Sequence, residues 1–201
     1  MGALAVSALF FVMPEQLTVG PRWLLFVLTI LILIPSSLMR RAGWLRAHEV
    51  LAYTGLSVIT LALVSSLGLL VWRLPGHKDP PVELLRAAAA LWVGNTLVFA
   101  SWYWRLDGGG PHERDKRGAH SDGAFLFPQM VMDEDLKRRM GEENWSPGFI
   151  DYLFLAFNTS TAFSPTDVPV LSRWAKVLMI VQSITSLMTI ALLAARAVNI
   201  L

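Results

Sequence analysis

Five polar residues in the C-terminal quarter of the chain carry side chains that can interact with ions. They follow a short apolar stretch and are Thr159, Thr161, Ser164, Thr166 and Asp167. Carboxylates at a membrane constriction attract cations, and hydroxyl oxygens can replace part of an ion's hydration shell. The set therefore predicts a wide, weakly selective path for cations. A structural role for Asp167 is the alternative, either as the cap of a neighbouring turn or as the partner of Arg173 or Lys176.

A second group of polar residues lies on the last apolar stretch of the chain. Gln182, Ser186 and Thr189 are spaced i, i+4 and i+7, so they share one face of a helix. Two roles fit such a stripe. It could line a water-filled vestibule, or it could hold helices together, because small polar side chains hydrogen-bond across helix contacts in membranes. The sequence leaves both roles open.

Other chemistries find little support in the residue types. The chain has no cysteine, which excludes disulfides, thiolate metal sites and a cysteine nucleophile. No glycine-rich phosphate loop and no nucleophile–base pair stands out. The residues with metal-ligand side chains between positions 112 and 122 fit no short zinc spacing, and three basic residues lie among them. We interpret this stretch as a solvated loop, and we expect no enzymatic activity, no bound metal and no cofactor. An enzyme or metal protein that uses the loop is the least favoured alternative. The residues in question are His112, Glu113, Asp115, His120 and Asp122.

The composition indicates an integral membrane protein. Hydrophobic residues make up 54% of the 201 residues and charged residues only 16%, against about 45–50% and about 25% in soluble domains. Four stretches without Lys, Arg, Asp or Glu approach the length of about 20 residues that crosses a bilayer. They are Trp23–Met39, Val50–Trp72, Ala87–Trp104 and Val177–Ala195. A fifth, Met1–Met13, is shorter than a bilayer and predicts a short or tilted span. The lipid bilayer is thus the expected partner, whereas a net charge of +2 predicts no binding to nucleic acid.

The linkers divide the chain into three parts. Residues 1–104 hold the N-terminal membrane helices, residues 105–145 form a long extramembrane loop, and residues 146–201 form a C-terminal module. Within the loop, Asp133–Glu143 predicts a short surface helix. The apolar segment Phe125–Pro128 predicts partial order, because it can dock on the membrane portion.

The C-terminal module begins with an apolar segment that is too short to cross a bilayer. Ser146 and Pro147 are suited to the start of a helix, and the apolar part runs only from Phe149 to Phe157 before polar residues follow. Pro165 then stops the helix, and another long apolar helix comes immediately after. This order predicts a re-entrant hairpin. Irregular backbone at membrane depth persists only where protein buries it or water fills a cavity.

Residues 157–196 resemble the pore module of the two-transmembrane, pore-loop ion channels, the superfamily that includes potassium channels. The segment FNTST at residues 157–161 is similar to the Phe-x-Thr-x-Thr end of their pore helix, and AFSPTD at residues 162–167 occupies the place of the filter. The segment ALLAAR at residues 191–196 is similar to the end of their inner helix. The remaining chain resembles uncharacterised bacterial membrane proteins. The resemblance implies a homotetramer in the bacterial cytoplasmic (inner) membrane, in which the five polar residues form the constriction and Gln182, Ser186 and Thr189 lie below it.

The filter segment departs from the family in a way that affects selectivity. Potassium selectivity depends on backbone carbonyls, and glycines give the filter the necessary conformations. Ser164 and Thr166 stand where the family has glycines, and Pro165 stands in the tyrosine position. We therefore expect an all-α polytopic protein with four to five transmembrane helices and a re-entrant pore helix. It would form an oligomeric pore weakly selective for monovalent cations and not for potassium. The alternative is a non-conducting, channel-derived scaffold or accessory subunit.

The membrane orientation has two conflicting predictions. In the channel family the pore loop enters from outside, which would place the long loop outside the cell. Twelve of the 17 Lys and Arg residues lie on the side of that loop, and the positive-inside rule places such a side in the cytosol.

Overall fold

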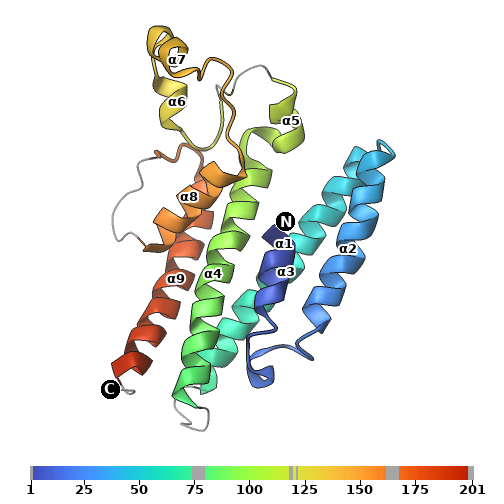
Figure 1. The fold of residues 1–201 in the computed structure, drawn as a ribbon, viewed down its shortest axis with the longest axis vertical. Coiled ribbons are helices and arrows are strands. Elements are labelled where there is room, and N and C mark those ends of the chain that lie inside the picture. Colours follow the sequence, from blue (N-terminus) through green and yellow to red (C-terminus); the bar gives the residue numbers. More distant parts are fainter. Residues whose placement is uncertain (1, 74–79, 118–119, 121, 162–167, 199–201) are drawn as a thin grey trace. The chain divides into compact units, whose positions relative to one another are not determined.

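The computed structural model describes residues 2–73, 80–117, 120, 122–161 and 168–198 (Figure 1). These residues are helical apart from turns, short connections and one isolated β-bridge. Four of the helices are long and apolar enough to cross a membrane. This confirms an all-helical chain with four candidate membrane spans.

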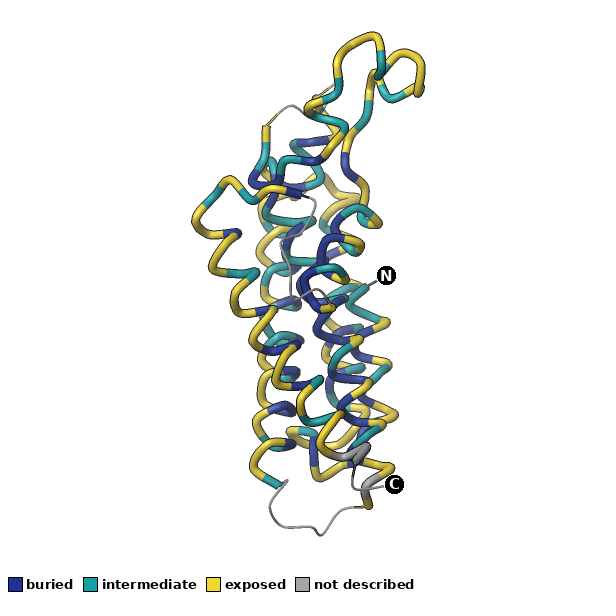
Figure 2. The backbone as a smooth tube through the Cα atoms, turned by 90° about the vertical axis from the view of Figure 1, so that its left-hand side faces the viewer, coloured by how far each residue is buried: buried dark blue, intermediate teal, exposed yellow. Residues whose placement is uncertain are grey.

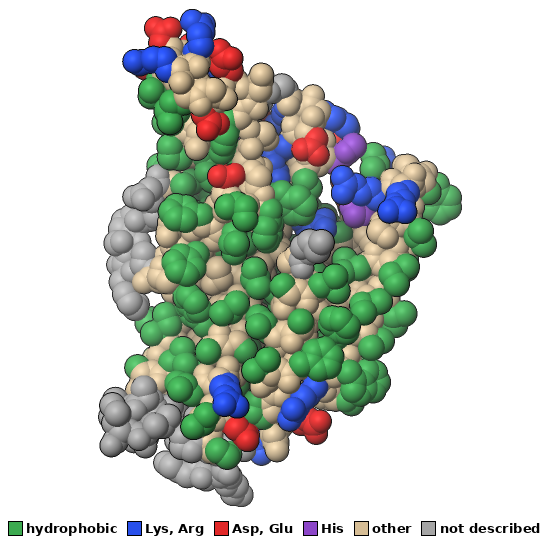
Figure 3. Space-filling view, viewed as in Figure 1, with side chains coloured by type: hydrophobic (Ala, Val, Ile, Leu, Met, Phe, Trp, Pro, Cys, Tyr) green, Lys and Arg blue, Asp and Glu red, His purple; other side chains and the backbone are tan. Residues whose placement is uncertain are grey.

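The four long helices coincide with the predicted apolar stretches. They are α2 (Leu24–Arg41), α3 (Leu45–Arg73), α4 (Pro81–Leu106) and α9 (Arg173–Val198). Three of them extend beyond their stretches at both ends, and α2 extends beyond its stretch only at the C-terminal end. The extra residues are largely charged or aromatic, and such residues continue a helix readily where it leaves the hydrocarbon. On the face shown in Figure 3, hydrophobic side chains cover the sides of the long helices and charged side chains gather near their ends.

The chain divides into two compact units, residues 1–98 with 185–201, and residues 99–184. The first unit begins with α1 (Gly2–Leu9) and the short 3-10 helix η1 (Glu15–Leu17). With eight residues, α1 is about 12 Å long at ~1.5 Å per residue, which is well short of a bilayer.

In the same unit α2 and α3 form an antiparallel hairpin. A close helix contact occurs at Gly55, where an added Cβ would lie 3.1 Å from Ile32 Cγ2. At the other end of the contact Ser36 Oγ lies 2.8 Å from His48 Nδ1. A glycine and a polar pair are both typical of helix contacts in membranes, where small residues allow close approach.

The second unit contains the long loop, which is largely ordered. It carries η3 (Asp107–Gly109), α5 (Pro111–Asp115), α6 (Pro128–Val131) and α7 (Glu134–Met140). The predicted surface helix is confirmed as α7, which begins where the Asp133 carboxylate accepts a hydrogen bond from the Leu136 N–H at 2.7 Å.

The predicted docking of the segment around Phe125 is also confirmed. Phe125 is fully buried, and its ring packs against those of Tyr103, Tyr152 and Trp174. Its backbone forms an antiparallel bridge with Val170, just before α9. The loop is therefore held to the segment that precedes the last helix.

Helix α8 (Phe149–Thr161) follows the loop and contains 13 residues. It begins at Phe149 rather than at the predicted Ser146–Pro147. The reason is the Asp151 carboxylate, which accepts a hydrogen bond from the Gly148 N–H at 2.7 Å and so satisfies a free donor at the helix start. Asp151 thus has the structural role that an acidic residue in a first turn predicts.

Candidate functional site

Helix α8 is too short to cross a bilayer. At ~1.5 Å per residue its 13 residues extend about 20 Å, compared with a hydrocarbon core of about 30 Å. Its buried face consists of Tyr152, Leu155, Ala156, Thr159 and Ser160. The opposite face is exposed and apolar until the last turn, with Ile150, Phe154 and Phe157 at 71%, 58% and 46% exposure.

Two of the predicted constriction residues lie in the last turn of α8. Thr159 is buried and Thr161 is exposed. Each hydroxyl donates a hydrogen bond to the carbonyl four residues earlier, to Leu155 at 2.8 Å and to Phe157 at 3.0 Å. The hydroxyl oxygens keep acceptor capacity, and only that of Thr161 belongs to an exposed residue. Ser164, Thr166 and Asp167 lie outside the described residues.

A buried hydrogen-bond network fixes the polar end of α8 to α9. The Gln182 side chain is fully buried, and its amide nitrogen donates to the Ala156 carbonyl at 2.7 Å and to Ser160 Oγ at 2.8 Å. Its amide oxygen accepts a hydrogen bond from the hydroxyl of Tyr103 on α4. One side chain of α9 therefore joins α4, α8 and α9.

The three polar residues of the last helix that could line a vestibule are all buried within the single chain. Gln182, Ser186 and Thr189 are exposed by at most 1%. The Thr189 hydroxyl donates to the Thr185 carbonyl at 2.7 Å. Most of the exposed side chains of α9 are instead apolar, including Ile180, Ile184 and Leu187. Of the two roles that the sequence left open, burial favours the contacts between helices.

A second buried polar cluster surrounds Asp107, where α4 ends. This side chain is completely buried and accepts two hydrogen bonds. One comes from the Ala124 N–H at 2.5 Å, and the other comes from the hydroxyl of Tyr152 on α8 at 2.6 Å. Because Tyr152, Ala156 and Ser160 are four residues apart, both clusters hold the same face of α8.

Two basic side chains complete this cluster. Arg114 is buried; its Nη1 donates to the Asp107 carbonyl at 2.6 Å, and its guanidinium lies 5.1 Å from the centre of the Tyr152 ring. His120 is also buried, with Nε2 at 3.6 Å from Asp107 Oδ2. Its ring packs edge-on against Trp145. Through the Ala124 N–H and the Tyr152 hydroxyl, the Asp107 carboxylate joins the loop to α8 at the end of α4.

Gly123 allows the loop backbone to pass close to the cluster. A Cβ at this position would lie 2.7 Å from Asp107 Oδ1 and 2.9 Å from His120 Nε2, distances that real Cβ atoms essentially never show. Only glycine leaves the space that the carboxylate and the imidazole occupy.

The Asp107 cluster was not predicted from the sequence. Of the five candidate metal-ligand residues between positions 112 and 122, only His120 is buried, while Glu113 and Asp122 lie at the surface in ion pairs with Lys116 and Arg117. The pair with Lys116 lowers the pKa of the Glu113 carboxyl. Among the described residues no three His, Asp or Glu side chains gather to hold a metal ion. A carboxylate directly after an apolar helix and before three glycines was the available signal for Asp107.

Comparisons with protein-family models, with curated protein sequences and with solved structures find no match to this chain.

Proposed function

We propose that this chain is a subunit of an oligomeric pore-loop channel in the bacterial cytoplasmic (inner) membrane, weakly selective for monovalent cations. The observation that carries the proposal is helix α8, which is too short to cross a bilayer and is held along one face by Asp107 and by Gln182. A pore needs such rigid positioning, because a constriction discriminates between ions only where its oxygen atoms are held in place.

The order of elements supports the same function. Helix α4, the long loop, α8, residues 162–167 and α9 follow one another as do the outer helix, connecting segment, pore helix, filter and inner helix of the pore-loop channels that the sequence resembles. In this arrangement Thr159, Thr161, Ser164, Thr166 and Asp167 form the constriction.

Oligomerisation is part of the proposal. A single chain leaves the outer faces of α8 and α9 exposed, including Phe154 and Ile184. One half-span cannot enclose a path by itself, so sister subunits must surround a shared axis. A homotetramer is the assembly that the resemblance implies.

A second function is favoured by the burial of the inner-helix polar residues. With Gln182, Ser186 and Thr189 inside the chain, most of the outer face of α9 is apolar. The filter segment also has Ser164 and Thr166 where glycines are expected. Both observations suit a channel-derived scaffold that assembles in the same way without conducting.

Recordings from purified protein in planar bilayers separate the two functions. For a channel we expect a current that follows the cation gradient and passes sodium and potassium with similar ease. Asp167→Asn should reduce it several-fold, because the carboxylate concentrates cations. The matched control is Asp135→Asn, which removes an exposed carboxylate from α7. Silence across ions and voltages, from a particle whose mass is that of a tetramer, favours the scaffold. A monomeric particle contradicts both.

A further inference from the structure

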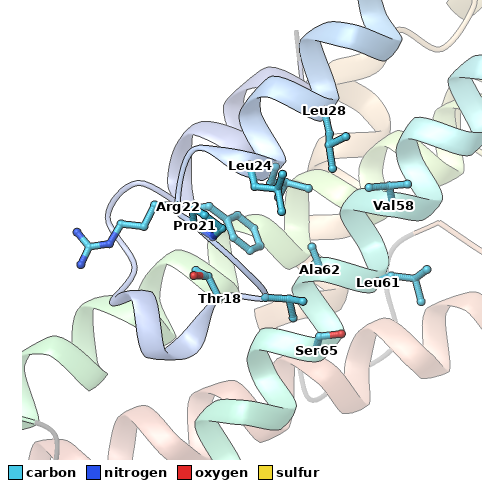
Figure 4. Close-up of a pocket in the computed structure, with 12 residues that line it drawn as sticks. Thr18, Pro21, Arg22, Leu24, Leu28, Val58, Leu61, Ala62 and Ser65 are labelled. Atoms are coloured by element: carbon cyan, nitrogen blue, oxygen red, sulfur yellow. The ribbon is translucent and has the colours of Figure 1, made fainter.

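The first structural unit contains an apolar groove separate from the proposed pore. It has a volume of about 240 Å³ and lies between α2, α3 and the segment that precedes α2 (Figure 4). Leu28 from α2 and Val58 from α3 project into the space between these helices, with Ala62 one turn further along α3. Apart from Thr18, Arg22 and Ser65 the lining is apolar.

The groove opens on a surface that we expect to face the hydrocarbon core of the membrane. Both lining helices are candidate membrane spans, and two of the apolar side chains that line the groove are exposed, Leu28 by 37% and Leu61 by 67%. The volume is below the ~300–1,000 Å³ typical of pockets for small molecules. A narrow apolar space of this size suits a single alkyl chain. In the membrane, the acyl chains of lipids surround the opening of the groove.

One end of the groove lies at the level of the lipid headgroups. Trp23 at the start of α2 and Trp72 at the end of α3 are 54% and 79% exposed, and exposed tryptophans mark the membrane–water interface. Arg22 lies beside Trp23. Its stem borders the groove, and its guanidinium points out of it (Figure 4).

The Arg22 guanidinium is available to an anion at this end. Its nearest carboxylate is that of Glu15, at 3.8 Å from Nε, and both side chains are largely exposed. Because this ion pair is long and exposed, it contributes little to stability. A guanidinium binds phosphate more strongly, through paired hydrogen bonds. We propose that the groove is a phospholipid site, with one acyl chain between α2 and α3 and the headgroup phosphate at Arg22.

Retention of lipid during purification tests the site independently of conduction. The chain is purified in a mild detergent from membranes supplied with phosphatidylglycerol, and bound phospholipid is measured by native mass spectrometry. We expect retained phospholipid on the wild-type chain. Ala62→Phe and Leu28→Trp, which fill the groove from opposite walls, should each reduce it several-fold. Ala194→Phe adds the same bulk at an exposed position on α9 and should leave it unchanged.

The role of Arg22 is tested with a matched pair of lipids. Phosphatidylglycerol and diacylglycerol with identical acyl chains are added to delipidated protein. We expect phosphatidylglycerol to bind several-fold better, and Arg22→Gln to abolish that preference without lowering the melting temperature. Unchanged phospholipid retention in both groove-filling variants, or equal binding of the two lipids to the wild-type chain, overturns the proposal.

Discussion

At the scale of single residues, Gln182 is the side chain on which the position of α8 most depends. Replacement by leucine would leave the Tyr103 hydroxyl and the Ala156 carbonyl without this partner in an apolar interior. Such a loss costs about 1–3 kcal/mol per buried group. We expect Gln182→Leu to lower the thermal unfolding temperature in detergent. Ser183→Ala, at the exposed neighbouring position, is the control and should unfold like the wild type. Equal unfolding temperatures for Gln182→Leu and the wild type would show that the network contributes nothing.

The position of the long loop depends in the same way on the side chain of Asp107. Asparagine is similar in shape, but its amide group offers one acceptor oxygen to two donors, the Ala124 N–H and the Tyr152 hydroxyl. We expect Asp107→Asn to loosen the loop and to increase the rate of tryptic cleavage at Arg114 and Lys116. The matched control is Asp122→Asn, at an exposed site. A cleavage rate equal to that of the control would contradict an anchoring role for Asp107.

At the scale of elements, α8 is predicted to descend into the bilayer rather than to lie on its surface. Nitroxide labels on its exposed face, at Ile150 and Phe157, are seven residues apart and should differ in depth by about 10 Å at ~1.5 Å per residue. Collision with oxygen and with a water-soluble nickel complex measures that depth. Two labels at equal depth would mean a helix parallel to the membrane plane, which would remove the basis of the pore proposal.

The sequence predicts the elements better than the contacts between them. Runs of apolar residues indicate the four spans because span length follows from bilayer thickness. The segment Asp133–Glu143 similarly indicates α7, because both signals are local in the sequence. The Asp107 cluster joins residues 45 positions apart in the chain, and no local pattern specifies that Tyr152 meets Asp107. Gln182 was found as a candidate, but its full burial depends on tertiary packing. Figure 2 shows that buried and exposed residues alternate along the long helices.

At the scale of the whole molecule, the four spans make the orientation a testable property. Because successive spans alternate in direction, four spans predict that the α2–α3 connection, the long loop and the segment before α9 share one side of the membrane. That side carries twelve of the 17 Lys and Arg residues. The positive-inside rule counts charges near span ends and therefore places this side in the cytosol, so that α8 enters the membrane from within.

Cysteine labelling decides the orientation, since the chain contains no cysteine and each introduced thiol is unique. Met140→Cys on α7 and Glu83→Cys at the start of α4 place exposed thiols on opposite sides. In intact bacterial spheroplasts, a membrane-impermeant maleimide should react with the thiol at position 83 and reach the one at position 140 only after lysis. The reverse pattern would put the loop outside, the orientation of the channels that residues 157–196 resemble.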